Sequence, residues 1–158
     1  MKNRRLEIRW GIYFIAMQLS WMLLEKLFGF HDAKIEQHAT VSMLVLIPSF
    51  LIYFLALRQK RLKDFGGKMS FKQGFVAGLI ITATVTVLTP FSQLITSLVI
   101  TPDYFGNMIA YAVDKGMMTQ LEAEAEFNLT NYLLISTVFA PVAGIVTSAV
   151  MAALNMRK

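Results

Sequence analysis

The sequence predicts an all-α integral membrane protein: a four-helix bundle with a short amphipathic extracytoplasmic helix between the third and fourth spans. Composition is the first reason, because hydrophobic residues make up 56% and charged residues only 16%, with a mean hydropathy of +0.54. A soluble domain has roughly 45–50% hydrophobic residues and about 25% charged residues. The excess lies in four blocks with few or no charges, and about 20 apolar residues cross a bilayer core. We therefore expect one membrane domain, 1–158, and not a soluble enzyme.

Each apolar block is expected to be a helix, because lipid offers no partner for unpaired backbone groups. The predicted spans are about 10–30, 41–57, 75–100 and 132–154. Prolines lie well inside three of them, at Pro48, Pro90 and Pro141. Each proline removes a backbone hydrogen bond and tends to kink its helix. Such kinks indicate either a bundle wedged open on one side or curved packing.

The charges between the spans are divided unevenly. The N-terminal tail, the loop between the second and third spans and the C-terminus hold 12 of the 15 cations, whereas the other two loops hold eight of the ten acids. The positive-inside rule then places both termini in the cytoplasm of a multi-pass protein of an inner (cytoplasmic) membrane. No DNA-binding motif surrounds the basic residues, so no nucleic-acid partner is expected. Four basic residues after the second span could bind lipid head groups: Arg58, Lys60, Arg61 and Lys63. The positive-inside rule alone also accounts for their charges, and this is the favoured interpretation.

Local signals mark helix ends outside the spans. Residues 102–115 have apolar positions at helical spacing, and the segment is too short to cross a bilayer. Thr101 is the expected N-cap, Pro102 suits the first helical position, and Gly116 is a stop signal. We expect this helix on the outer membrane face or capping the bundle. Two capping boxes mark further helix starts: Ser70 with Gln73, and Thr119 with Glu122.

Small residues recur at helical spacing on the third and fourth spans. Gly74 and Gly78 form a GxxxG step, and every fourth residue of the last span is small: Ala140, Gly144, Ser148 and Ala152. Such rows let helices approach closely. The partner of the fourth span could be the third span of the same chain or the same span of a second copy.

A polar face on the third span suggests a second kind of surface. Together with two residues of the first span it defines a candidate polar cleft: Gln18, Glu25, Thr82, Thr86, Thr89 and Gln93. Such a face could line a path for a ligand, or it could be buried against other helices. Burial is the favoured interpretation, because small and hydroxyl residues allow helices to pack closely. The last three spans contain no Asp, Glu, Lys, Arg or His, although ion-coupled carriers usually need such a residue within the membrane.

The outer end of the first span carries groups that could bind a ligand. Glu25 is expected to reach the membrane interface; the alternative is a buried acid that faces the bundle and binds a cation or a polar head group. Four possible nitrogen and oxygen ligands follow within eight residues, at His31, Asp32, Glu36 and His38. Their spacing is not a recognised zinc pattern. A solvated loop is therefore the favoured interpretation, and no metal or other cofactor is predicted.

Three stretches carry a family resemblance: LLEKLFGFHDAKI at 23–35, FGGKMSFKQGFVAGLIIT at 65–82 and TPDYFGNMIAYAVDKGM at 101–117. Together they resemble a bacterial membrane protein family of unknown function, domain-of-unknown-function family number four-one-nine-nine. The resemblance covers nearly the whole chain and implies no activity. Members of that family resemble small integral membrane proteins encoded near lipid-linked sugar glycosyltransferases.

Two function classes follow. The absence of GxSxG, HExxH and P-loop motifs indicates that the protein is not an enzyme. The leading interpretation is an interaction or accessory subunit that associates through helix packing, as a homo-oligomer or with a membrane protein such as a lipid-linked sugar glycosyltransferase. The alternative is a small transporter or lipid-binding protein with a polar cleft lined by the third span.

Overall fold

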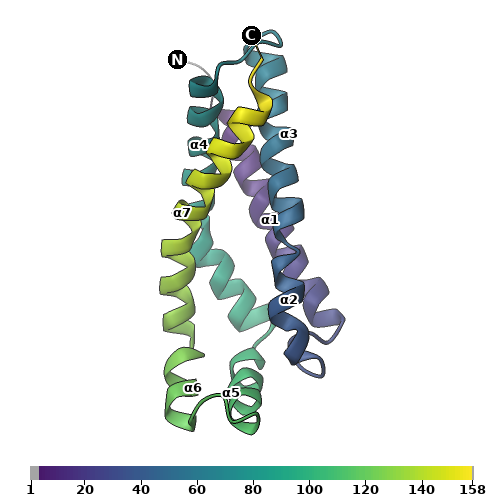
Figure 1. The fold of residues 1–158 in the computed structure, drawn as a ribbon, viewed down its shortest axis with the longest axis vertical. Coiled ribbons are helices and arrows are strands. Elements are labelled where there is room, and N and C mark those ends of the chain that lie inside the picture. The colour runs from purple at the N-terminus through teal and green to yellow at the C-terminus, as the bar shows by residue number, and fades with distance from the viewer. Residues whose placement is uncertain (1–3, 158) are drawn as a thin grey trace.

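The computed structural model describes residues 4–157 and is all-α over that range, with one isolated antiparallel bridge between Met69 and Arg157. Lys2 and Lys158, which contribute to the predicted cytoplasmic charge, lie outside the described residues. Four long helices run along the long axis of an elongated molecule (Figure 1). They are α1 (Arg5–Leu27), α3 (Leu46–Asp64), α4 (Phe71–Ile95) and α7 (Leu129–Asn155).

Shorter helices gather at the end of the molecule opposite to the described chain ends (Figure 1). They are the 3₁₀ turn η1 (Ile35–Gln37), α2 (His38–Met43), the π-helix η2 (Thr96–Ile100), α5 (Tyr104–Asp114) and α6 (Gln120–Glu126). We call this end the distal end, and the end that contains the described chain ends the proximal end.

Three helical segments of the described chain are long and apolar enough to span a membrane: Ile35–Asp64, Phe71–Ile100 and Leu129–Asn155. They correspond to the second, third and fourth predicted spans. The first predicted span, 10–30, falls on α1, which is not in this set. Charged residues lie near both ends of α1, and Gln18 and Ser20 interrupt its middle, so its composition is less apolar than that of the others.

The second predicted span, 41–57, differs from the helices that form. The chain begins a new helix, α3, just before Pro48. A proline in the first turn of a helix sacrifices no intrahelical hydrogen bond, so Pro48 starts a helix here instead of kinking one. At its other end α3 continues to Asp64, and Gly66 and Gly67 follow with positive φ angles of 57° and 91°. The basic residues expected in a loop therefore lie on the last turns of α3.

Helices α4 and α7 form the most extensive helix pair, through the predicted small residues. Gly74 lies against Ala152, and Gly78 lies against Ser148. Gly144 faces Thr82 so closely that a Cβ on the glycine would stand 2.7 Å from the Thr82 hydroxyl oxygen. We call this contact the α4–α7 seam.

Hydrogen bonds tie the α4–α7 seam to α3. The Thr82 hydroxyl lies 3.1 Å from the Ser148 hydroxyl and 3.0 Å from the Tyr53 hydroxyl, and all three side chains are buried. The small-residue rows thus meet within one chain, which answers the question that the sequence left open. They are not a free surface for a partner, so the accessory interpretation loses the contact on which it was based.

Local helix signals are mostly confirmed. Both predicted capping boxes form, at the start of α4 and at the start of α6. The amphipathic helix predicted at 102–115 forms as α5, but the predicted N-cap is wrong. Asp103 occupies the cap position, while Thr101 is buried before the helix with no hydrogen-bond partner for its hydroxyl oxygen in the described structure.

Candidate functional site

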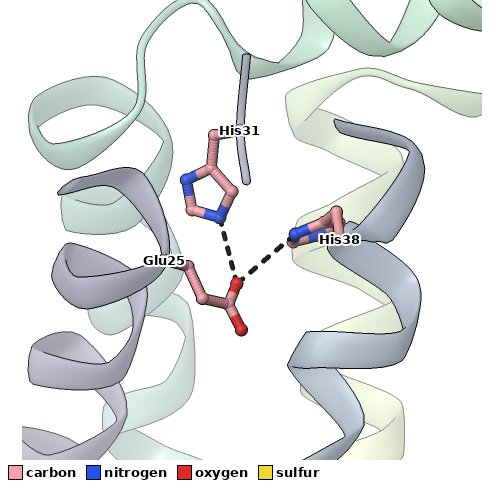
Figure 2. Close-up of side chains that lie close together, drawn as sticks. All are labelled: Glu25, His31 and His38. Atoms are coloured by element: carbon pink, nitrogen blue, oxygen red, sulfur yellow. Dashed lines mark hydrogen bonds and ion pairs between the residues drawn. The ribbon is translucent and has the colours of Figure 1, made fainter. Parts of the chain in front are cut away.

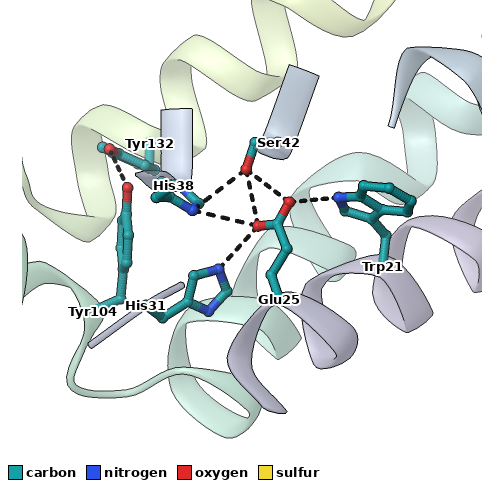
Figure 3. A network of polar contacts seen from close by, with 7 residues as sticks. All are labelled: Trp21, Glu25, His31, His38, Ser42, Tyr104 and Tyr132. Atoms are coloured by element: carbon teal, nitrogen blue, oxygen red, sulfur yellow. Dashed lines mark hydrogen bonds and ion pairs between the residues drawn. The ribbon is translucent and has the colours of Figure 1, made fainter. Parts of the chain in front are cut away.

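A buried carboxylate lies at the centre of a polar network at the distal end (Figure 3). Glu25, near the C-terminal end of α1, is only 2% exposed. The indole N–H of Trp21, one turn earlier, donates to Glu25 Oε1 at 2.5 Å, and the Ser42 hydroxyl donates to both carboxylate oxygens at 2.8 and 2.9 Å. The expectation that Glu25 reaches the membrane interface is therefore wrong. The alternative, a buried acid that faces the bundle, describes its position.

Two histidines meet the same oxygen of this carboxylate (Figure 2). His31 Nε2 lies 3.0 Å and His38 Nδ1 lies 3.3 Å from Glu25 Oε2. The chain reverses direction after α1 at Gly29, whose φ of 81° favours glycine. This reversal brings His31 back over the end of α1, and η1 then places His38 at the start of α2. We call these three residues the Glu–His cluster.

A tyrosine from α5 covers the Glu–His cluster. The Tyr104 ring centroid lies 5.4 Å from that of His31 and 5.0 Å from that of His38. Its hydroxyl lies 3.4 Å from the Tyr132 hydroxyl of α7 (Figure 3). Burial raises the pKa of the Tyr104 phenol above its ordinary value, so this group stays protonated. Asn107 adds a second link from α5 by donating to the His31 carbonyl at 2.9 Å.

A cleft of about 300 Å³ lies among α1, α3, α4 and α7, where α4 and α7 separate beyond the seam. We call it the lateral cleft. Three residues of the predicted polar cleft line it: Gln18, Thr89 and Gln93. The remaining wall is mainly apolar and includes Phe14 and Val85.

A smaller cavity of about 90 Å³ connects this region with the Glu–His cluster. It is lined by His31, His38, Thr101 and Tyr104. It shares three wall residues with the lateral cleft: Met22, Gln93 and Thr96. The Glu–His cluster and the lateral cleft are thus neighbours inside the protein.

A family model described as "Protein of unknown function (DUF4199)" matches residues 9–157, nearly the whole chain. The chain belongs to this family. The resemblance read from the three sequence stretches is therefore confirmed. No curated protein and no solved structure matches the chain. The DUF4199 description names no activity.

The predicted site residues of this DUF4199 protein separate into different places. Thr82 belongs to the α4–α7 seam, and Ala140 lines the lateral cleft instead of joining that seam. Thr86 lines neither cavity, and its buried hydroxyl has no partner among the described residues. Glu25 belongs to the Glu–His cluster. The structure therefore brings together part of the predicted polar cleft and divides the rest between packing and a separate cluster.

Two of the four possible ligands that the sequence offered, His31 and His38, lie together in the structure. His31 is buried at 4% exposure, so the solvated-loop interpretation is wrong for this residue. Asp32 and Glu36 are exposed and lie outside the cluster, and Glu25 supplies the acid instead. Glu25 sits six residues before His31 and on the preceding helix. Nothing in the local spacing shows that the chain reverses so as to join them.

A second buried carboxylate lies at the proximal end. Lys60 Nζ is 2.7 Å from Glu7 Oε1 and 2.5 Å from Asp64 Oδ2, and Lys60 is 3% exposed. The nearby Arg61 donates to the Asn155 carbonyl at 2.9 Å. Lys60 therefore does not fit the predicted role of a lipid head-group ligand, because its charge is used inside the protein. Arg58 and Lys63 are exposed, and for them the role stays a prediction.

Proposed function

We propose that this protein is a membrane protein that binds a lipid-like molecule in the lateral cleft. The proposed class is that of small transporters and lipid-binding proteins, the alternative predicted from the sequence. The observation that carries the proposal is the cleft itself, about 300 Å³ of space between helices of membrane-spanning length. Small-molecule sites typically have roughly 300–1,000 Å³ and mostly apolar walls.

The rim of the cleft supports a ligand that enters from the bilayer. Leu46 and Phe50 on α3 and Phe139 on α7 line the cleft and are 50%, 42% and 64% exposed. With α3 and α7 in a membrane, these side chains face acyl chains instead of water. The cleft then opens sideways into the hydrocarbon region, where one chain of an amphiphile can enter with little change of environment.

The polar groups of the cleft favour an uncharged hydrogen-bonding group on the ligand. No charged residue is found among the described residues that line it. The Ser49 and Thr89 hydroxyls donate to carbonyls of their own helices, so they are already engaged. Gln18 has no hydrogen-bond partner in the described part of the chain, and Gln93 uses its amide N–H on Ser97. These two amides are available to a hydroxyl or an ester of the ligand.

We further propose that α1 is a fourth span, in the bacterial inner membrane with both termini cytoplasmic. Its 23 residues give a length of about 34 Å at 1.5 Å per residue, enough for a hydrocarbon core of ~30 Å. It packs alongside α3 and α4, and the described chain ends lie together at the proximal end (Figure 1). Reporter fusions at the two termini test this topology, and an extracytoplasmic C-terminus would contradict it.

The cleft is tested by filling it. The full chain is reconstituted in phosphatidylglycerol vesicles that contain a phosphatidylglycerol with a photoactivatable acyl chain. Ala143 lines the cleft, so Ala143→Phe should abolish labelling of the cleft wall after illumination. Ala153→Phe is the matched control, because Ala153 is an exposed residue of the same helix outside the cleft. Equal labelling of both variants would show surface lipid only and would refute the proposal.

Two expectations from the sequence stay predictions. Association with a second copy or with a membrane enzyme would have to use a surface other than the α4–α7 seam, and the oligomeric state in detergent with co-purification from membranes tests it. The expectation that the protein has no catalytic activity of its own is likewise open to assay.

A further inference from the structure

We infer that the Glu–His cluster is a binding site for a divalent metal ion of the zinc type. The inference rests on the geometry of Glu25, His31 and His38 and not on the lateral cleft. Each residue offers one ligand atom, and no two of these atoms are more than 4.8 Å apart. They converge from three separate places in the chain: the end of α1, the turn that follows it, and the start of α2.

The separations suit an ion placed between the side chains. Zinc binds imidazole nitrogen and carboxylate oxygen at about 2.0–2.2 Å, so neighbouring ligand atoms of a tetrahedral site lie about 3.3–3.5 Å apart. Glu25 Oε2 lies 3.0 Å from the His31 nitrogen and 3.3 Å from the His38 nitrogen. Small side-chain rotations would complete the geometry, and the partly buried His38 ring has the freedom to make them.

The ligand types select the class of metal. Two imidazoles and one carboxylate form a set that holds zinc with one position left for water or another ligand. Calcium and magnesium prefer oxygen ligands throughout, so they fit this set poorly. The 90 Å³ cavity that both histidines line provides room for that fourth ligand.

The surroundings orient the carboxylate as an outer shell of a metal site would. Trp21 binds Glu25 Oε1 and Ser42 binds both oxygens, which holds Oε2 toward the two histidines. In the described structure no lysine or arginine pairs with Glu25. A divalent ion would supply the positive charge that this buried carboxylate otherwise obtains only from imidazoles.

Unpartnered buried atoms give independent support. His31 Nδ1 and the Thr101 hydroxyl oxygen are buried without hydrogen-bond partners in the described part of the chain, and both residues line the small cavity. If His31 only donates to Glu25 through Nε2, its Nδ1 is an acceptor that no donor reaches. With a metal on Nε2, Nδ1 carries the proton and can donate to a water in the cavity.

The test uses the full chain, purified in detergent and stripped with EDTA. Calorimetric titration with Zn²⁺ should give one ion per chain, and Co²⁺ should produce the visible absorption bands of a low-symmetry site. Glu25→Gln and His38→Gln should each weaken binding by at least about 10–100-fold, the loss that removal of an outer-shell group alone causes. Glu36→Gln is the matched control, since it removes an exposed acid from the same segment.

Thermal unfolding gives a second measurement, because a ligand of the native state raises its midpoint. Zn²⁺ should raise the midpoint of the wild type and of Glu36→Gln but not that of His38→Gln. If Glu25→Gln does not fold, His38→Gln carries the test, because its ring is only partly buried. Absence of saturable binding, or equal binding by His38→Gln and Glu36→Gln, would overturn the inference. Ala143→Phe should keep the ion, which separates this result from failure of the cleft proposal.

Discussion

Helix α1 carries one buried glutamate at each end of the molecule, and the two have different partners. Glu7 and Glu25 are both 2% exposed and stand 18 residues apart, which is five turns of about 3.6 residues. They therefore lie on the same face of one helix. Glu7 pairs with Lys60, a side chain that carries a positive charge, whereas Glu25 meets two histidines. The difference teaches that burial of an acid does not define its role; the chemistry of its partner does.

The two ends also differ in packing. At the proximal end the α4–α7 seam is closed by glycine against small side chains. Toward the distal end α4 presents Val85, Thr89 and Gln93, and Pro90 interrupts its backbone hydrogen bonds, so the helices separate and leave the lateral cleft. The proximal half is thus closely packed at the α4–α7 seam, and the distal half contains the lateral cleft and the Glu–His cluster.

The largest expected effect comes from breaking the proximal ion pair. Lys60→Met leaves the buried Glu7 carboxylate without a cation, which should lower the free energy of unfolding by about 3–5 kcal/mol. Lys63→Met, an exposed change on the same helix, should have little effect. Tryptophan fluorescence during thermal unfolding in detergent measures both. The double variant with Glu7→Gln should recover part of the loss, and no recovery would contradict the pairing.

The next largest effect is expected when a glycine is replaced by alanine at a tightly packed position and at an open one. Gly144→Ala would place its Cβ 2.7 Å from the Thr82 hydroxyl oxygen, so we expect a loss of about 1–3 kcal/mol from overpacking. Gly106→Ala meets nothing within 4 Å and lies inside α5, where alanine should stabilise the helix by roughly 0.5–1 kcal/mol. Unfolding midpoints of the two variants should move in opposite directions. A higher unfolding midpoint for Gly144→Ala would contradict the tight seam at this glycine.

A smaller loss of stability is expected at the distal acid without metal. Glu25→Gln in EDTA keeps hydrogen-bonding atoms in place and removes a charge that no lysine or arginine balances, so the expected loss is about 1–2 kcal/mol. Glu36→Gln again serves as the control. A loss as large as that of Lys60→Met would show that the distal network is a fixed ion pair like the proximal one.

The smallest effect concerns the capping box of α6, at the periphery of the distal end. The Thr119 backbone N–H and hydroxyl donate to the Glu122 carboxylate, which lowers its pKa below the ordinary value of 4.5. A lowered pKa stabilises the folded state above 4.5, and this contribution is lost as the pH falls through the lowered value. Hydrogen exchange of the α6 amides should therefore lose protection below pH 4.5. Glu122→Gln should remove this pH dependence, whereas Glu124→Gln should leave it in place.

Features that depend on residues close together in the chain could be predicted from the sequence. Three apolar segments of spanning length, two capping boxes and the α5 helix follow from composition and from signals within a few residues of each other, and all of them form. The family was also evident from short stretches of sequence. One local prediction was wrong: the N-cap of α5 is Asp103 and not Thr101.

Which helix faces pack against each other could not be predicted from the sequence and is seen in the folded chain. The sequence showed the rows of small residues but not that Gly144 faces Thr82 of the same chain, because spacing along a helix does not state the rotation of its neighbour. It marked His31 and His38 but paired them with the nearby acids at 32 and 36, since the reversal at Gly29 that reaches Glu25 is a matter of backbone direction. The sequence suggested that Lys60 is a surface cation. In the structure Lys60 is buried, because it forms an ion pair with Glu7, which is distant in sequence. Burial of charge is decided by such long-range partners, and no local pattern contains them.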